Sequence, residues 1–263
     1  MADQRIEVNG VTLRVRAEGP DGAPCVVFGN SLVTDLTVWD AQAEVLRDRY
    51  RVLRYDQRGH GLSEVGSAPP SIDLLGADLD ALLERFAIES CTYVGLSMGV
   101  PTGLAAFANR PSAFSRLVLV DGQAKSAATG RAFWEERIAF AREEGMERYA
   151  QVTAERWLGE AALADDRGER LRAMIAATPI EGLVFGATCL MNYDQSVALA
   201  RIDMPLLALA GADDGAMPER MAETFGSLPN ARVEVVPGAG HLPNFEAPGA
   251  FNRHLLSFLE AAT

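Results

Sequence analysis

Short apolar runs that alternate with amphipathic stretches constrain the fold of this chain more than any other feature. Apolar, β-branched runs bounded by turn residues, typical of strands, lie at 5–8, 11–15, 25–28, 51–55, 92–95 and 117–120. The later runs are apolar at successive positions, as expected of strands that are covered on both faces. Amphipathic stretches that predict helices lie at 41–46, 72–86 and 101–108. The alternation predicts an α/β fold with a mostly parallel sheet flanked by helices.

The pattern changes in the middle of the chain. Charge-rich segments with helical periodicity and no convincing strand occupy 131–144, 146–157 and 167–177. Alternation then resumes with a strand, a helix, a strand and a helix at 205–210, 218–225, 232–236 and 250–259. We therefore expect a core domain of residues 1–121 and 201–263, with a helical cap of residues 122–200 inserted in it.

Charge and hydropathy exclude several classes of partner. The 263 residues carry a net charge of −12, which repels the phosphate backbone, so we expect no nucleic-acid partner. Lys125 is the single lysine and lacks the glycine spacing of a phosphate-binding loop. The chain shows no leader peptide, and its longest apolar runs, such as 205–212, are too short to span a membrane. A cytoplasmic protein without a membrane partner is expected.

Cysteine and histidine spacing argues against metal and disulfide chemistry. The three cysteines, Cys25, Cys91 and Cys189, are scattered and odd in number, which predicts reduced, buried thiols. No two of the three histidines lie within four residues of each other, so the usual two-histidine metal motifs are absent. We expect neither a metal nor another cofactor.

The strongest chemical signal is Gly95-Leu96-Ser97-Met98-Gly99, which lies between a predicted strand and a predicted helix. A sharp strand-to-helix turn brings backbone segments very close together, which glycine tolerates. Such a turn also presents the serine hydroxyl at a helix N-terminus, where developing negative charge is favoured. Ser97 is therefore predicted to be a nucleophile.

A serine nucleophile needs a general base that is oriented by a carboxylate, and the order Ser, acid, His is typical of one hydrolase arrangement. His241 follows the strand at 232–236 and is the predicted base; His60 and His254 are expected to have packing roles at the surface or core edge. Asp214, after the strand at 205–210, is favoured over Asp213 as the orienting acid.

Two further predictions complete this arrangement. Asp121, which follows the strand at 117–120, is a second candidate for the acid. Acyl transfer also needs two backbone N–H donors for the oxyanion. The positions after the nucleophile and after an early strand predict Met98 and Leu32 for this oxyanion hole.

Together these residues resemble the α/β-hydrolase superfamily over nearly the whole chain, and most of all the 3-oxoadipate enol-lactonase group. The narrower likeness rests on Asn30-Ser31-Leu32, Trp39-Asp40, the segment from Arg51 to Ser63, the Gly-Leu-Ser-Met-Gly motif, the segment 134–138 and the segment from His241 to Pro248. The resemblance implies an eight-stranded sheet, a catalytic triad of Ser97, Asp214 and His241, and a place in aromatic catabolism. Asp56 and Arg58 are expected to tie a structural turn rather than to catalyse.

This chain departs from the family at Val33 and Val100, where glycine is usual, and we expect the added side chains to narrow or reshape the acyl pocket. Arg137 is a candidate for binding a substrate carboxylate. Trp134, Trp157 and Met191 are candidates for lining the pocket, although residues at helical spacing also serve as packing faces.

The sequence therefore predicts a serine hydrolase that opens a small lactone or ester through an acyl-enzyme, most closely of the enol-lactonase type. A carboxylesterase of other specificity and a cofactor-free perhydrolase or haloperoxidase are alternatives that use the same triad. A ligand receptor with little turnover is an alternative of a different class. The sequence makes no prediction of the oligomeric state.

Overall fold

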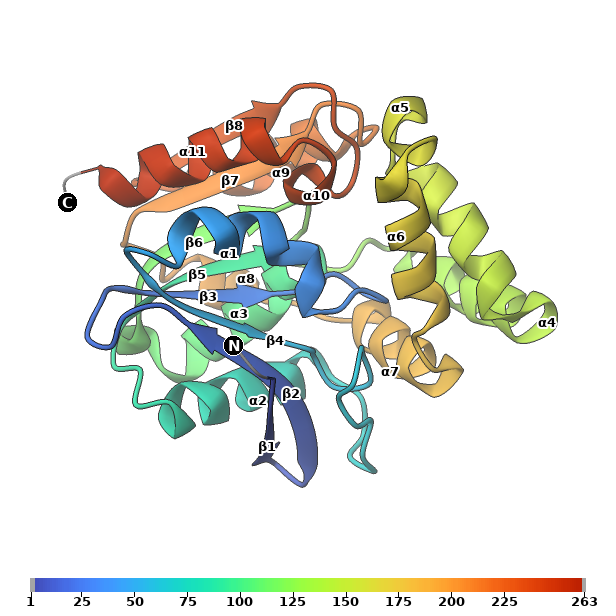
Figure 1. The fold of residues 1–263 in the computed structure, drawn as a ribbon, viewed down its shortest axis with the longest axis horizontal. Helices are drawn as coiled ribbons and strands as arrows, with labels where there is room; N and C mark the ends of the chain where they lie inside the picture. Colours follow the sequence, from blue (N-terminus) through green and yellow to red (C-terminus); the bar gives the residue numbers. More distant parts are fainter. Residues whose placement is uncertain (1–2, 262–263) are drawn as a thin grey trace.

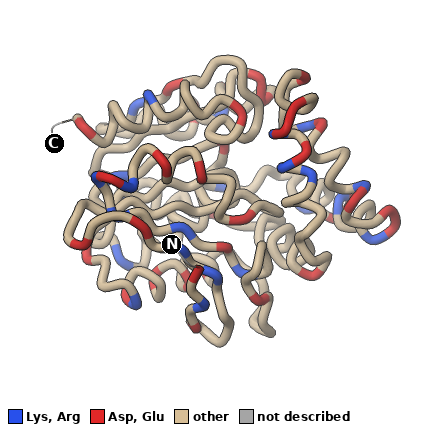
Figure 2. The backbone as a smooth tube through the Cα atoms, in the orientation of Figure 1, with Lys and Arg blue, Asp and Glu red and all other residues tan. Residues whose placement is uncertain are grey.

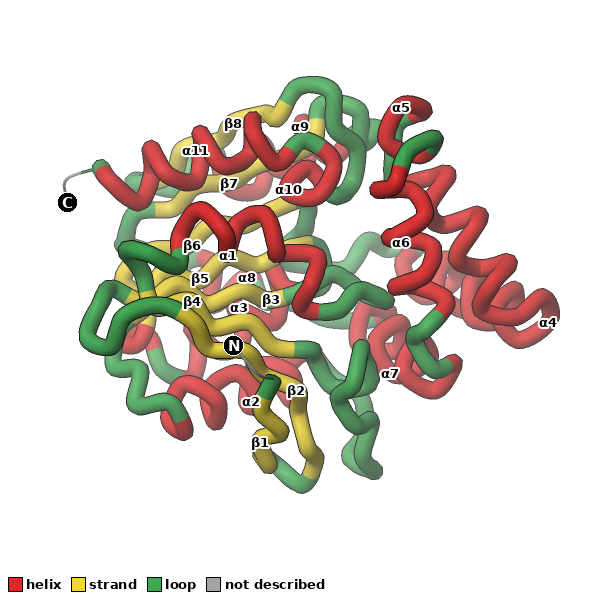
Figure 3. The backbone as a smooth tube through the Cα atoms, in the orientation of Figure 1, coloured by secondary structure: helices red, strands yellow, loops and turns green. Residues whose placement is uncertain are grey.

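One eight-stranded sheet runs through the molecule (Figures 1 and 3). The computed structural model describes residues 3–261. In spatial order the strands are β1 (Gln4–Val8), β2 (Val11–Glu18), β4 (Arg51–Tyr55), β3 (Cys25–Gly29), β5 (Cys91–Leu96), β6 (Phe114–Val120), β7 (Leu206–Gly211) and β8 (Ala231–Val236). Strand β2 runs antiparallel to both of its neighbours, and all other pairs are parallel. The predicted mostly parallel sheet is confirmed.

Helices cover both faces of the sheet because side chains alternate along each strand. Val26 and Phe28 belong to one apolar cluster with helices α1 (Asp40–Leu46) and α11 (Pro248–Glu260). Val27 belongs to a second cluster on the other face. That face is covered by α2 (Ile72–Arg85), α3 (Gly99–Asn109) and α9 (Met217–Phe225). Both faces are buried, which explains the continuous apolar runs of the central strands.

Further helices connect β6 to β7 and lie at one end of the sheet (Figure 1). They are α4 (Gly130–Trp157), α5 (Glu160–Leu163), α6 (Asp166–Ala176) and α7 (Ile180–Met191), called the inserted helices below. Gly145 has φ 85° and ψ 165° and bends α4, as the two separate helical segments predicted there imply. Helix α7 was not among the predicted segments, because it is apolar almost throughout and lacks the charged periodicity of its neighbours.

The two connections to the inserted helices run side by side. Ser126 donates a backbone hydrogen bond to Tyr193, Gln195 donates one to Ala124, and Lys125 pairs with Asp194 at 2.6 Å. This pairing supports the proposal that residues 122–200 form an inserted cap. The short helix α8 (Ser196–Leu199) falls within that range, yet it packs through Ala198 in the cluster of α2 and α3.

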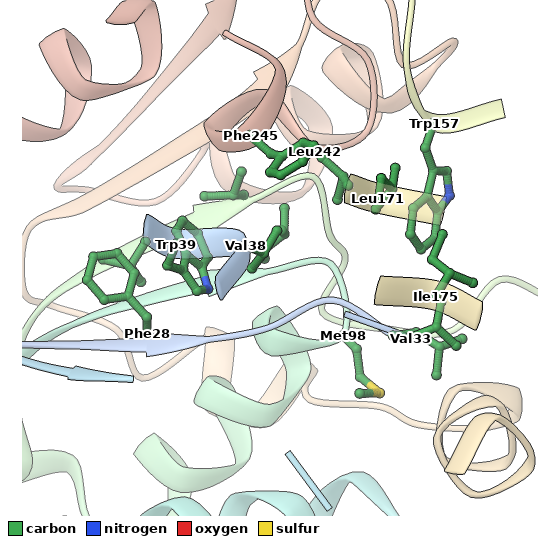
Figure 4. Close-up of a cluster of buried hydrophobic side chains, with 14 of the residues drawn as sticks. Phe28, Val33, Val38, Trp39, Met98, Trp157, Leu171, Ile175, Leu242 and Phe245 are labelled. Atoms are coloured by element: carbon green, nitrogen blue, oxygen red, sulfur yellow. The ribbon is translucent and has the colours of Figure 1, made fainter. Parts of the chain in front are cut away.

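The inserted helices share a continuous apolar core with one face of the sheet (Figure 4). Phe28 and Trp39 pack with ring centroids 4.7 Å apart at the sheet. Leu171 and Ile175 of α6 and Trp157 of α4 belong to the same cluster and are buried. The insertion is therefore held on the sheet by side-chain packing as well as by its two connections.

The segment after β4 is a buried polar turn. Asp56 accepts hydrogen bonds from the backbone N–H groups of Leu36 and Leu62, and Arg58 forms a two-point ion pair with Asp78 at 2.8 Å. The predicted structural role of Asp56 and Arg58 is confirmed. The expected surface or core-edge position of His60 is wrong, because its side chain is fully buried beneath α7. His254 is half-buried on α11 and contacts Glu234.

Two other predictions concern the whole chain. The three cysteines are free and buried among the described residues, as predicted. No single helix in residues 3–261 is both long and apolar enough to cross a membrane; α6 and α7, which meet at 92°, satisfy the length and composition limits only when taken together.

Candidate active site

Ser97 lies at the turn between β5 and α3, with a φ of 53°. A Cβ atom on Gly95 would lie 2.5 Å from the carbonyl oxygen of Gly99, and a Cβ on Gly99 would lie 2.5 Å from that of Gly29. Only glycine permits this close approach, so the two flanking glycines allow the backbone to hold Ser97 in a conformation that is strained for an L-residue.

A continuous hydrogen-bonded chain joins Ser97 to a histidine and an aspartate. The Ser97 Oγ lies 3.0 Å from His241 Nε2, and His241 Nδ1 lies 2.8 Å from Asp214 Oδ2. The three residues are distant in the sequence but each follows the carboxyl end of a parallel strand, so they meet at one edge of the sheet.

Loop hydrogen bonds select Asp214 over its neighbour Asp213. The backbone N–H of Asp213 donates to the carbonyl of Ala239 at 2.8 Å, and that of Asp214 donates to Gly211 at 3.2 Å. Asp213 is exposed, whereas the side chain of Asp214 accepts the hydrogen bond from His241. The backbone N–H of His241 donates to the carbonyl of Trp157 at 2.9 Å, which ties this loop to α4.

A second carboxyl group, that of Asp121, lies against the same chain. It is fully buried after β6, and both of its oxygens accept from the Gly211 N–H at 3.1 Å. Burial and then the charge of Asp214 raise the pKa of Asp121 well above its ordinary value. Burial acts to raise the pKa of Asp214, but the hydrogen bond and charge of His241, the hydrogen bond with Asp121 and the charge of Arg156 together outweigh it, so the pKa is lowered. The two carboxyl groups are therefore shifted in opposite directions, Asp121 towards its neutral form and Asp214 towards its ionised form.

Among the described residues, Asp121, Asp214 and His241 are also a group with three potential metal-ligand atoms within 4.8 Å of one another. Both ring nitrogens of His241 already have hydrogen-bond partners in Asp214 and Ser97. The hydrogen bonds account for how this group is held without a metal.

The backbone N–H groups of the two predicted oxyanion donors have no hydrogen-bond acceptor among the described residues. Leu32 and Met98 both line the cavity beside Ser97. Neither backbone N–H donates a hydrogen bond to another residue in the described part of the chain. Buried N–H groups are nearly always paired, so these two are available for a substrate oxygen.

The cavity at this site has a volume of about 370 Å³ and is bounded by the sheet loops and the inserted helices. Its lining residues are Leu32, Ser97, Met98, Asp121, Gly122, Gln123, Ser126, Ala127, Thr129, Gly130, Phe133, Trp134, Arg156, Trp157, Leu190, Tyr193, Asp214, Met217, Arg220 and His241. The size suits a small ligand rather than a polymer.

The predicted substrate-binding residues divide into two groups. Trp134 and Trp157 line the cavity, and the Trp157 ring packs on the His241 ring with centroids 5.1 Å apart. Arg137 and Met191 do not line it. Arg137 instead donates to Thr153 Oγ1 at 2.8 Å, because the bend at Gly145 folds the second half of α4 back over it.

Val33 and Val100 do not line the cavity, so their side chains do not narrow it by direct contact, and the expected reshaping of the pocket stays a prediction. Both are buried, Val33 with a φ of 54°, and Val100 points towards Gly122. The sequence also missed Arg156 and Phe133 as lining residues. No sequence signal marks them, since their position depends on the bend in α4.

Comparisons with known proteins all find similarity to hydrolases. A family model described as the alpha/beta hydrolase fold matches residues 24–248. A 3-oxoadipate enol-lactonase of Acinetobacter baylyi is 33% identical over 92% of this chain and 91% of its own length. A crystal structure of a hydrolase from Pseudomonas aeruginosa has a TM-score of 0.91 and 36% identity, covering 98% of each chain. The enol-lactonase of Burkholderia xenovorans LB400 has a TM-score of 0.91 and 31% identity, covering 98% of this chain and 100% of that one.

Proposed function

The chain belongs to the alpha/beta hydrolase family, and on that premise we propose that it is a serine hydrolase that opens a small lactone or ester, with a 3-oxoadipate enol lactone as the favoured substrate. The observation that carries the proposal is the hydrogen-bonded chain from Ser97 through His241 to Asp214 at the wall of a small cavity. The likeness to enol-lactonases at 31–33% identity supports the substrate class.

The geometry supports acyl transfer in two stages. In the first, Ser97 Oγ attacks the lactone carbonyl while His241 takes its proton, and the ring C–O bond breaks to release an enolate that remains tethered to the acyl group. In this proposal the N–H groups of Leu32 and Met98 stabilise the oxyanion, and loss of one such donor costs about 3 kcal/mol in the barrier.

In the second stage water replaces the serine. His241 passes its proton to the enolate oxygen and then takes a proton from water, which attacks the acyl carbon and restores Ser97. Asp214 stabilises the charged imidazole; burial acts to raise its pKa, but the hydrogen bond and charge of His241, together with Asp121 and Arg156, lower it and so favour the carboxylate. The released enol then ketonises in solution.

A substrate panel tests this proposal. We would measure kcat and KM for 3-oxoadipate enol lactone, saturated lactones and p-nitrophenyl esters, with and without peroxide. We expect turnover of the enol lactone to exceed that of the other substrates. Fast hydrolysis of simple esters without lactone turnover would instead favour a carboxylesterase, and activity that requires peroxide would favour a perhydrolase.

The Ser97→Ala variant tests the mechanism. We expect kcat to fall by a factor on the order of 10⁵ or more, and a fluorophosphonate to label the wild-type chain but not the variant. A Ser97→Ala variant that keeps its turnover would overturn the proposal. Tight lactone binding with turnover slower than about one per minute in the wild type would favour a receptor.

A further inference from the structure

Arg156 places a guanidinium on the cavity wall, and none of the described acids forms an ion pair with it. Arg156 lines the cavity next to Trp157, the residue whose ring packs on His241. Among the described residues, Arg156 forms no ion pair and no side-chain hydrogen bond. The chain as a whole carries a net charge of −12, so an arginine without an ion pair gives the cavity wall a positive charge that contrasts with the negative charge of the rest of the chain.

Aromatic rings hold this guanidinium in place. Its Cζ lies 5.4 Å from the centre of the Phe133 ring and 6.0 Å from that of Trp157. Both rings also line the cavity. Contacts of this kind stabilise a cation and restrict its motion but leave its N–H groups free to donate.

A second arginine adds positive charge behind the first. The Arg137 Cζ lies 5.7 Å from the Phe133 ring and 4.8 Å from the Tyr149 ring, and its guanidinium donates to Thr153 and Tyr149. Burial and then the charge of Arg137 lower the pKa of Arg156 to about 10, so the group is still charged at neutral pH. An anion in the cavity would relieve this repulsion.

The acids near the cavity offset this charge only in part: the charge of Asp214 acts to raise the pKa of Arg156, but burial and the charge of Arg137 outweigh it. Asp214 is engaged by His241, and the pKa of Asp121 is raised well above its ordinary value. Arg220 on α9 also lines the cavity and, like Arg156, is exposed, but the described residues give its guanidinium no ring contact or hydrogen bond. Arg156 is therefore the better-positioned of the two cations.

We propose that Arg156 is the residue that selects substrates carrying a carboxylate, by binding that carboxylate with its free N–H groups while the ester or lactone carbonyl lies at Ser97. The inference rests on the proposed hydrolase function and deepens it. It moves the carboxylate-binding role from Arg137, which faces Tyr149 and Thr153, to Arg156, which faces the cavity.

Matched ester pairs test the inference. The probes are p-nitrophenyl half-esters of succinate, glutarate and adipate, each compared with its methyl-capped, uncharged counterpart. We expect the wild type to prefer at least one charged member, and Arg156→Gln to lose that preference by about ten- to hundredfold, mainly through KM. Arg156→Lys should retain part of the preference for charged esters, because the lysine keeps the positive charge but loses the planar guanidinium that donates two parallel N–H bonds to a carboxylate.

Two control variants make the result specific. Arg142→Gln makes the same charge change on an exposed part of α4 that does not line the cavity, and it should keep the wild-type preference. Arg220→Gln tests the competing cation. A preference lost in Arg220→Gln and kept in Arg156→Gln would overturn the inference, as would equal losses for charged and uncharged esters.

A binding measurement separates this inference from the proposed function. In a Ser97→Ala background, calorimetry would compare monomethyl adipate with dimethyl adipate, with and without Arg156→Gln. The inference would be supported if monomethyl adipate bound more tightly than dimethyl adipate and Arg156→Gln removed this difference. That result would hold even if no ester were turned over. Equal binding of both ligands would refute it even in an active hydrolase.

Discussion

The two regions that enclose the cavity are built by different means. The sheet supplies Ser97, Asp214 and His241 from loops that follow β5, β7 and β8, whose positions are set by parallel register. The inserted helices supply Phe133, Trp134, Arg156 and Trp157 from a single helix with one bend. Figure 2 shows charges of both signs gathered along α4, whereas the central strands carry few. In the proposed function, the sheet loops carry the groups that react and the inserted helices carry those that select the substrate.

The two regions meet at His241. Its backbone donates to the Trp157 carbonyl and its ring packs on the Trp157 ring. Changes in the sheet loops should therefore act on kcat, whereas changes in the inserted helices should act on KM and substrate preference. The predictions below test that division.

After Ser97→Ala, the largest effect is expected for Asp214→Asn. The amide cannot stabilise the charged imidazole and favours the wrong tautomer, so kcat should fall by about 10⁴-fold with KM little changed. Asp213→Asn is the matched control, because Asp213 is exposed and its side chain has no described hydrogen bond. Steady-state kinetics of both variants would measure this, and equal losses would contradict the assignment of Asp214.

The next effect concerns stability in acid and the buried His60. Burial lowers the pKa of His60 from its ordinary value of 6.5 to about 4. As the pH drops, His60 is therefore protonated near pH 6.5 in the unfolded chain but only near pH 4 in the folded chain. The free energy of unfolding should fall by about 3 kcal/mol across that window as the pH drops. Burial raises the pKa of Asp56 to about 6, which acts in the opposite direction over part of the window.

Urea unfolding at several pH values would measure the contribution of His60 to the pH dependence of the free energy of unfolding. His60→Gln should remove the acid-dependent loss and leave the opposite slope from Asp56. A His60→Gln variant with an unchanged slope would show that His60 does not carry this effect.

A smaller effect is expected at the bend of α4. Gly145 has a φ and ψ that L-residues rarely adopt, so Gly145→Ala should lower the free energy of unfolding by about 1–3 kcal/mol. If the bend positions Arg156, the variant should also change the preference for charged esters more than kcat. Gly249→Ala, where an added Cβ meets nothing within 4 Å, is the control and should not destabilise the protein.

The smallest effect is expected for Asp121→Asn. Burial raises the pKa of Asp121 and so favours its neutral form, which an amide of the same shape resembles. The amide should keep the hydrogen bond with Asp214, and kcat should stay within about threefold of wild type. Asp121→Ala should cost more, about 1–3 kcal/mol in stability, since the Gly211 N–H loses its buried acceptor. A loss in Asp121→Asn as large as that in Asp214→Asn would make Asp121 the orienting acid.

Much of the sheet could be predicted because strand ends and glycine turns are local features. The Gly95–Gly99 motif and the order of Ser97, Asp214 and His241 were readable because each follows a predicted strand, and parallel strands bring their carboxyl ends to one edge. The inserted helices were readable in part, since α7 lacks a polar face and gave no periodic signal.

The sequence by itself determined which groups reach the sheet edge, because strand periodicity and the glycine turn act over a few residues. Only the tertiary structure decided that His241 is hydrogen-bonded to Asp214, the aspartate that the sequence favoured over Asp213. It also decided that His60 is buried and that Arg156 rather than Arg137 faces the cavity. Each of these depends on the direction of a side chain after distant segments have packed together, and neighbouring residues do not specify that direction.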